Sequence, residues 1–153
     1  MTSRDEHPNW DRMDELFRSD SYARELGITL EDWGGGWSRV HYVPVEEHHN
    51  FGGIAHGGSI FSVGDVAFSV ASNSWGRRAV ALTVDAHFLS APEVGTPLVA
   101  EGKERSRTRR TASYQIEISD ARGPVGSLHA MVYRLGAWFF GEEAWPEQWV
   151  RDH

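Results

Sequence analysis

A single carboxylate stands out in the chain because it lies in a segment that is otherwise apolar or small. The segment covers residues 59–74, and Asp65 is its only charged residue. Apolar and small side chains fall on every face of a helix built from it, a pattern typical of a buried helix. A lone carboxylate there is strongly unfavourable unless something compensates for its burial. We expect Asp65 to act as a nucleophile or general base; the alternative is a carboxylate that reaches solvent or a partner's backbone amides.

The sequence His56-Gly57-Gly58 directly precedes this segment. Glycines at this point leave backbone N–H groups open at the positive end of the helix dipole, where they would stabilise a developing oxyanion. The alternative is that the glycines only allow a tight turn into the helix.

The spacing of these two features predicts a shared site. Gly57 and Asp65 are eight residues apart, which is roughly 12 Å along one helix at about 1.5 Å rise per residue. One carbonyl group cannot contact both. A site that uses both must take them from two subunits whose helices lie antiparallel across a two-fold axis, so we expect an obligate homodimer with two sites.

The remaining sequence predicts the elements that position this helix. Helical spacing of apolar residues indicates a short N-terminal helix over residues 8–19. Alternating residues around Gly34-Gly35-Gly36 indicate a hairpin over about 26–43, and four further strands are expected at about 80–89, 98–107, 110–119 and 125–135. Short connections make the sheet antiparallel. We therefore predict one α+β domain over residues 1–153, with a core at about 26–135 in which a curved antiparallel sheet wraps around one long buried helix.

Composition narrows the class of protein. The chain has 22 acidic and 15 basic residues, a net charge of −7 and no cysteine, which argues against broad nucleic-acid binding, disulfides and cysteine-based metal or catalytic chemistry. No apolar run approaches the roughly 20 residues of a membrane span, and we expect a cytoplasmic protein. Residues 103–110 nevertheless contain five cations, which suits a small phosphorylated ligand. The aromatic tail, residues 137–153, is expected to pack on the sheet or on a partner chain.

Two stretches carry a family resemblance. Residues 48–65, HHNFGGIAHGGSIFSVGD, followed by residues 83–92, TVDAHFLSAP, resemble the hotdog-fold acyl-CoA thioesterases of the phenylacetate-degradation (PaaI) type. The resemblance covers about residues 26–135. Gly64 and Val66 replace the alanine and threonine that usually flank the helix aspartate, and these departures concern packing more than chemistry.

The resemblance implies a role for each matching residue. Asp65 would be the nucleophile or the base that activates water, and the Gly57 amide would polarise the thioester carbonyl. Asn50 would hold the carbonyl or the water, while Ser69 and Thr83 match positions whose hydroxyls assist. His56 would either hydrogen-bond the sulfur side of the thioester or fix the loop. The implied substrate-binding residues are Gly58, Ser90, Pro92, Arg105, Arg107, Arg109 and Arg110, the arginines being candidates for the phosphates of coenzyme A.

The resemblance also implies the partners and leaves the acyl group open. It implies no metal and no cofactor, since coenzyme A is part of the substrate and product, and a dimer of dimers. Phenylacetyl-type and medium-chain acyl groups are both compatible with the residues expected to line the pocket, which are Phe51, Phe61, Phe68, His87 and the aromatic tail.

Several rival functions are weighed against this one. A metal site from His48, His49, His56 and Asp65 lacks ligands at helical i, i+4 spacing, and a serine hydrolase built on Ser59 or Ser62 lacks the G-x-S-x-G turn. A hotdog dehydratase or hydratase acting on 3-hydroxyacyl or enoyl thioesters shares the fold. A non-catalytic acyl-CoA-binding module would not need Asp65.

Overall fold

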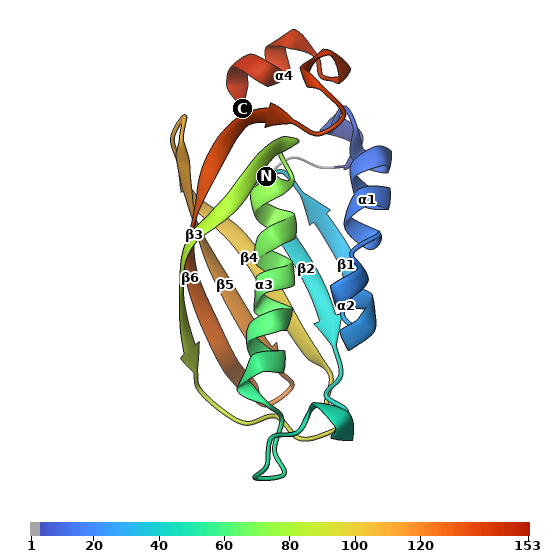
Figure 1. The fold of residues 1–153 in the computed structure, drawn as a ribbon, viewed down its shortest axis with the longest axis vertical. Coiled ribbons are helices and arrows are strands. Elements are labelled where there is room, and N and C mark those ends of the chain that lie inside the picture. Colours follow the sequence, from blue (N-terminus) through green and yellow to red (C-terminus); the bar gives the residue numbers. More distant parts are fainter. Residues whose placement is uncertain (1–3) are drawn as a thin grey trace.

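The computed structural model describes residues 4–153 and consists of one sheet, one long helix and several short helices (Figure 1). The strands are β1 (Thr29–Gly34), β2 (Trp37–Tyr42), β3 (Arg77–Phe88), β4 (Leu98–Arg107), β5 (Thr111–Asp120) and β6 (Gly123–Trp138). The α-helices are α1 (Trp10–Arg18), α2 (Ser21–Leu26), α3 (Gly57–Asn73) and α4 (Glu147–Asp152). Three short 3₁₀ helices, η1 (Arg4–Glu6), η2 (Glu46–His48) and η3 (Glu142–Ala144), lie in the connections.

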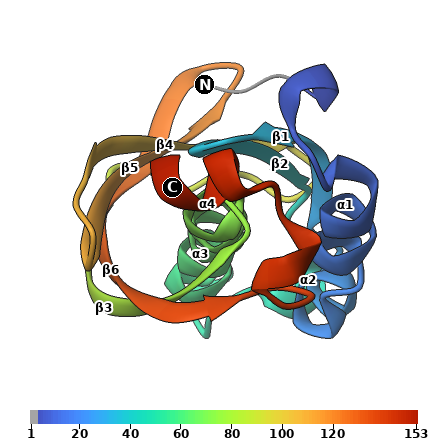
Figure 2. The same ribbon diagram turned by 90° about the horizontal axis from the view of Figure 1, so that it is seen from above.

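The six strands form one antiparallel sheet in the order β1-β2-β4-β5-β6-β3. Seen from above, the sheet curves around α3 (Figure 2). In β5 the alternate residues Ala112, Tyr114, Ile116 and Ile118 are buried against this helix, as the sequence pattern predicts. The predicted arrangement, a curved antiparallel sheet around one buried helix, is confirmed.

Helix α3 is the centre of the core, and eleven of its seventeen residues are buried. It approaches the sheet closely at Gly64, where a Cβ atom would come within 2.6 Å of Leu128 Cδ1. An alanine at this position would require the Leu128 side chain to move. Ser38 strengthens the contact, because its hydroxyl donates a hydrogen bond to the Ala67 carbonyl at 2.6 Å.

The N-terminal helix expected over residues 8–19 is confirmed as α1. A second helix, α2, follows it and was not predicted. The Asp20 side chain accepts a hydrogen bond from Ala23 N at 3.0 Å and so starts the new helix, which Gly27 ends with a left-handed φ of 75°. Because α2 is only six residues long, it has no apolar periodicity that a sequence pattern could show.

The aromatic tail packs on its own chain. Trp138 and Trp145 are buried in a second apolar cluster together with Met13 of α1 and Trp33 of β1. The Trp149 indole donates a hydrogen bond to the Trp75 carbonyl, just beyond α3, at 2.9 Å. Of the two alternatives for the tail, packing within the chain is therefore the one observed. No helix among residues 4–153 is long and apolar enough to cross a membrane.

Candidate active site

The N-terminus of α3 offers one open backbone donor. His56 caps the helix, and its Nδ1 accepts a hydrogen bond from Gly58 N at 2.8 Å. The next N–H groups, those of Ser59 and Ile60, donate to the His56 carbonyl. Within residues 4–153 nothing accepts a hydrogen bond from Gly57 N–H. The capping histidine therefore uses the Gly58 donor and leaves the Gly57 donor at the positive end of the helix dipole.

The cap also orients the His56 ring. Its Nδ1 faces Gly58 N, so Nε2 is the ring nitrogen left for any other contact. Two roles were expected for His56, a contact with the sulfur side of the thioester or fixing the loop. The hydrogen bond from Gly58 N is a contact of the second kind.

Asn50 builds the loop that enters the helix. Its side-chain Oδ1 accepts hydrogen bonds from Gly52 N at 2.8 Å and from Ile54 N at 3.4 Å. The backbone N–H of Asn50 donates to the Ile54 carbonyl. Its amide NH₂ group makes no hydrogen bond to the described residues. Asn50 therefore has a structural role through its oxygen and a free donor on its nitrogen. Phe51 is at the tip of this loop and is fully exposed.

Asp65 lies on the least buried stripe of α3, one turn after Phe61 and one turn before Ser69. Its carboxylate is half-buried and makes no hydrogen bond or ion pair within residues 4–153. Burial raises the pKa of Asp65 above its ordinary value, and the charge of Asp20 at the start of α2 raises it further. An unpaired carboxylate with raised basicity is suited to accept a proton.

Gly57 and Asp65 do not meet within one chain. Both belong to the same continuous helix. At a rise of about 1.5 Å per residue, they are therefore separated by roughly 12 Å along its axis. The Ser69 hydroxyl is exposed beside Asp65, as its spacing predicts.

The other predicted residues lie on or after β3. Thr83 is exposed in β3, next to an irregularity in the pairing with β6 between Ala81 and Thr83. The Ser90 hydroxyl donates to the Pro124 carbonyl at 3.1 Å, and Pro92 is buried. These two residues follow the end of β3, which reaches the N-terminus of α3.

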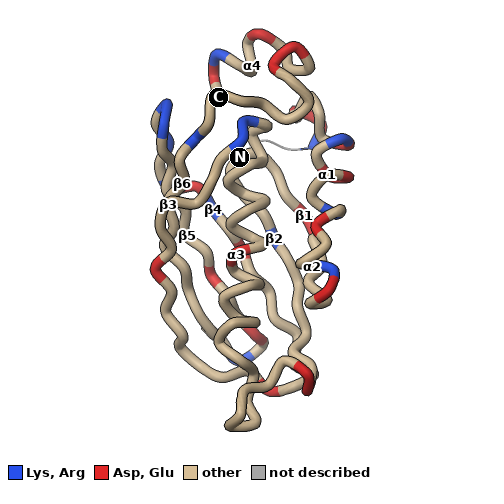
Figure 3. The backbone as a smooth tube through the Cα atoms, viewed as in Figure 1, with Lys and Arg blue, Asp and Glu red and all other residues tan. Residues whose placement is uncertain are grey.

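The predicted arginines lie at the other end of α3. They belong to the hairpin between β4 and β5, which Figure 3 shows at the same end of the molecule as α4. Arg105, Arg109 and Arg110 are exposed. Arg107 instead pairs with Glu104 at 3.2 Å, and its guanidinium lies 4.2 Å from the ring centroid of Trp75. A helix of this length separates the arginines from Gly57 of their own chain by about 25 Å.

The structure also bears on the rival sites. No group of three His, Asp or Glu side chains in residues 4–153 is placed to hold a metal ion. The hydroxyls of Ser59 and Ser62 donate to the carbonyls of His56 and Gly58 rather than to a catalytic base. Phe68 is buried against Tyr114 in the core, so it cannot line a pocket as expected.

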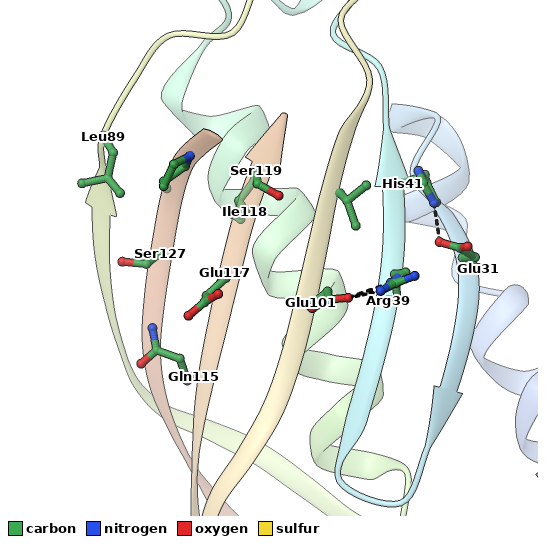
Figure 4. A pocket seen from close by; sticks show the side chains of 13 residues that line it. Glu31, Arg39, His41, Leu89, Glu101, Gln115, Glu117, Ile118, Ser119 and Ser127 are labelled. Carbon is green, nitrogen blue, oxygen red and sulfur yellow. Dashed lines mark hydrogen bonds and ion pairs between the residues drawn. The ribbon is translucent and has the colours of Figure 1, made fainter. Parts of the chain in front are cut away.

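Two cavities border these elements. A cavity of about 220 Å³ beside the N-terminus of α3 is lined by residues that include Tyr22, His48, His56 and Ser62. A larger groove of about 680 Å³ lies on the face of the sheet away from α3 (Figure 4), with Glu31, Arg39, Glu101 and Glu117 among its lining residues. Neither cavity is lined by Gly57 or Asp65, so the cavities of a single chain do not identify the site.

Phe88 is the residue of this region that sequence reasoning missed. A Cβ atom on Gly57 would lie 3.5 Å from Phe88 Cε1, so the ring lies against Gly57, the residue that carries the free N–H group. The alternation of Val84, Ala86 and Phe88 along the strand was the available signal, since it places all three on one face of the sheet.

Comparison with known proteins identifies the family. The profile of the thioesterase superfamily matches residues 52–127. The acyl-coenzyme A thioesterase PaaI of Escherichia coli is 30% identical over 137 residues, which cover 89% of this chain and 98% of that protein. The chain belongs to the thioesterase superfamily. A putative esterase of Archaeoglobus fulgidus is 34% identical over 123 residues, covering 80% of each chain.

Comparison with solved structures supports the same family for this thioesterase. The E. coli PaaI protein, from the phenylacetic acid degradation operon, superposes with a TM-score of 0.81 at 29% identity, covering 86% of this chain and 96% of that one. The resemblance to PaaI-type proteins and the predicted hotdog fold are thereby confirmed.

Proposed function

We propose that this thioesterase hydrolyses an acyl-CoA to the free acid and coenzyme A, with Gly57 and Asp65 as the reacting residues. The observation that carries the proposal is the free Gly57 N–H at the N-terminus of a helix that also holds an unpaired, half-buried carboxylate. The similarity to an acyl-coenzyme A thioesterase supports the substrate class. The family leaves the acyl group open between phenylacetyl-type and medium-chain groups.

The proposed chemistry needs only these groups and water. The Gly57 N–H donates a hydrogen bond to the thioester carbonyl oxygen and stabilises the oxyanion that develops there. Asp65 accepts a proton from water as the water oxygen bonds to the carbonyl carbon. The C–S bond then breaks, the oxyanion returns to a carbonyl, and the departing thiolate takes up the proton that Asp65 accepted. In the alternative route, Asp65 itself attacks the carbonyl carbon and the C–S bond breaks with loss of the thiolate. Water then hydrolyses the resulting anhydride to the free acid and restores the Asp65 carboxylate.

The shared site requires a second copy of the chain, and β3 is the edge that supports such pairing. It lies at one edge of the sheet and, within residues 4–153, pairs only with β6. Two apolar residues on it, Val80 and Leu82, are 49% and 54% exposed. A long apolar edge strand presents unpaired backbone groups that a second copy can pair with. Two chains joined in this way across a two-fold axis would bring antiparallel α3 helices together, with Gly57 of each chain facing Asp65 of the other.

The remaining residue roles are proposed from side chains with free polar groups. The free Asn50 NH₂ group and the exposed Ser69 and Thr83 hydroxyls suit contacts with the carbonyl or the water. The exposed Arg105, Arg109 and Arg110 suit the phosphates of coenzyme A better than Arg107, whose guanidinium is already paired. The dimer of dimers and the cytoplasmic location stay predictions.

The test is thiol release from a panel of short, medium-chain, long and aromatic acyl-CoAs, followed with a chromogenic disulfide. We expect turnover by the wild type and loss of most turnover in Asp65→Asn, which is nearly isosteric and removes only charge and basicity. Full activity in Asp65→Asn would overturn the assigned role. Acyl-CoA binding by the wild type without thiol release would point to a dehydratase, a hydratase or a binding module.

A further inference from the structure

Phe88 is the side chain that lies against Gly57, and its position follows from the register of the sheet. Val84, Ala86 and Phe88 pair with Ala130, Leu128 and Gly126 of β6. Ala130 and Leu128 belong to the buried core, and directly paired residues of antiparallel strands share a face. Phe88 therefore lies on the inner face of the sheet, at the point where that face extends past the core to the N-terminus of α3.

The Phe88 ring is held in place but is not covered. The end of β3 is tied to β6 by hydrogen bonds from Leu89 N and Ser90 N to the Val125 carbonyl, at 2.9 and 3.1 Å. Gly126, the residue paired with Phe88, has no side chain to cover the ring. One side of the ring lies against Gly57, with Phe88 Cε1 3.5 Å from the position of a Cβ atom there, yet the residue is 57% exposed. An exposed apolar ring thus lies against the first residue of α3, whose N–H group has no acceptor within residues 4–153.

We propose that Phe88 is the wall against which the acyl group of the thioester packs, and that it determines the acyl preference of the enzyme. This inference rests on the proposed function, because it takes the thioester carbonyl to be bound at Gly57 N–H. The carbonyl carbon has two substituents. The thiol arm of coenzyme A carries two polar amides, whereas the acyl group is hydrocarbon or aryl and complements an apolar ring.

The chain supplies a matched control in the next residue. Leu89 is 58% exposed, almost the same as Phe88, but it lines the groove on the opposite face of the sheet (Figure 4). Leu89→Ala therefore removes a similarly exposed apolar side chain at the same end of β3 without changing the surface beside Gly57.

The experiment compares kcat/KM of wild type, Phe88→Ala, Phe88→Leu and Leu89→Ala for acetyl-, hexanoyl- and phenylacetyl-CoA. We expect Phe88→Ala to lower kcat/KM for the two larger substrates by about tenfold, because a methyl group contacts the ring less than a longer chain or a phenyl group does. We expect a change below about threefold for acetyl-CoA. Phe88→Leu should give an intermediate effect and Leu89→Ala no change in selectivity. An equal loss for all three substrates would overturn the proposal, since it would place Phe88 against the thiol arm or the helix.

A binding measurement separates this inference from the proposed hydrolysis. Calorimetric dissociation constants for the unreactive thioethers S-methyl-CoA and S-hexyl-CoA do not depend on turnover. One outcome is that the wild type hydrolyses none of the substrates, while Phe88→Ala binds S-hexyl-CoA more weakly and S-methyl-CoA equally well. That outcome would support the acyl wall and overturn the proposed function. Turnover by the wild type with unchanged selectivity in Phe88→Ala would overturn the acyl wall alone. A wild type that neither binds nor hydrolyses any of these compounds would overturn both.

Discussion

At the scale of single residues, the helix N-terminus has two glycines with different roles. Gly58 N–H is bound to the His56 ring, and Gly57 N–H is open. This difference rests on one side-chain conformation, that of the capping histidine. It makes the oxyanion role of Gly57 testable without altering the fold, because Gly57 occupies the first position of the helix.

Gly57→Pro removes the N–H donor at a helix position that accepts proline. Proline is favoured at the first helical position, where its N–H would have no intrahelical partner, and it requires an extended residue before it. His56 meets that requirement with φ −63° and ψ 134°. We expect kcat/KM of Gly57→Pro to fall by about 100-fold or more, the typical effect of losing one oxyanion donor.

The control for this experiment is Gly57→Ala, which keeps the N–H group. Its methyl group would make an ordinary contact with Phe88 at 3.5 Å. We expect a loss of less than about tenfold for this variant. Equal losses in the two variants, at equal thermal stability and helix content, would contradict the donor role of Gly57.

At the scale of elements, α2 affects the chemistry of α3 although it contributes no proposed catalytic residue. Asp20 starts α2 through its hydrogen bond to Ala23 N, and its charge helps to raise the pKa of Asp65. One side chain therefore performs two tasks, capping and electrostatics, and two substitutions separate them.

Asp20→Asn keeps a capping oxygen and removes the charge. Hydrolysis needs Asp65 deprotonated, so kcat should fall as the pH drops through the raised pKa of Asp65. Without the Asp20 charge, that pKa is lower and the acidic limb of the profile should move to lower pH. Asp20→Ala should shift the profile in the same way and also lower the free energy of unfolding by about 1 kcal/mol, measured by urea denaturation. An unchanged acidic limb in both variants would show that Asp20 does not influence the reacting carboxylate.

At the scale of the whole molecule, the proposed site exists only in a dimer. Each site would combine Gly57 of one chain with Asp65 of the other. A heterodimer of one Asp65→Asn chain and one Gly57→Pro chain then holds one intact site and one site that lacks both groups.

Mixing these two inactive variants should restore activity. Random reassociation makes about half of the dimers heterodimers, so we expect roughly a quarter of the wild-type rate per chain. Thiol release is measured after unfolding and refolding the mixture, with differently tagged chains to quantify the heterodimer. Each variant refolded alone is the control and should stay inactive. Confirmed heterodimers without recovered activity would overturn the site shared between Gly57 of one chain and Asp65 of the other.

Much of the fold could be predicted from local patterns. The alternation in residues 111–118 placed β5 and its buried face, and the all-round apolar composition of residues 59–74 placed α3, because period and burial are coupled along one element. The six-residue helix α2 escaped prediction because it is too short to show a period. Asp65, Gly57 and their separation were also accessible, since they depend only on residue type and helical rise.

What the sequence determined by itself was the set of chemical groups and their order on one helix. Tertiary structure alone decided which of them are available, because availability depends on contacts between residues far apart in the chain. Arg107 looks like a free cation in the sequence but is paired with Glu104 beside Trp75. Phe88 stands 31 positions after Gly57 and lies against it only because the end of β3 returns to the N-terminus of α3.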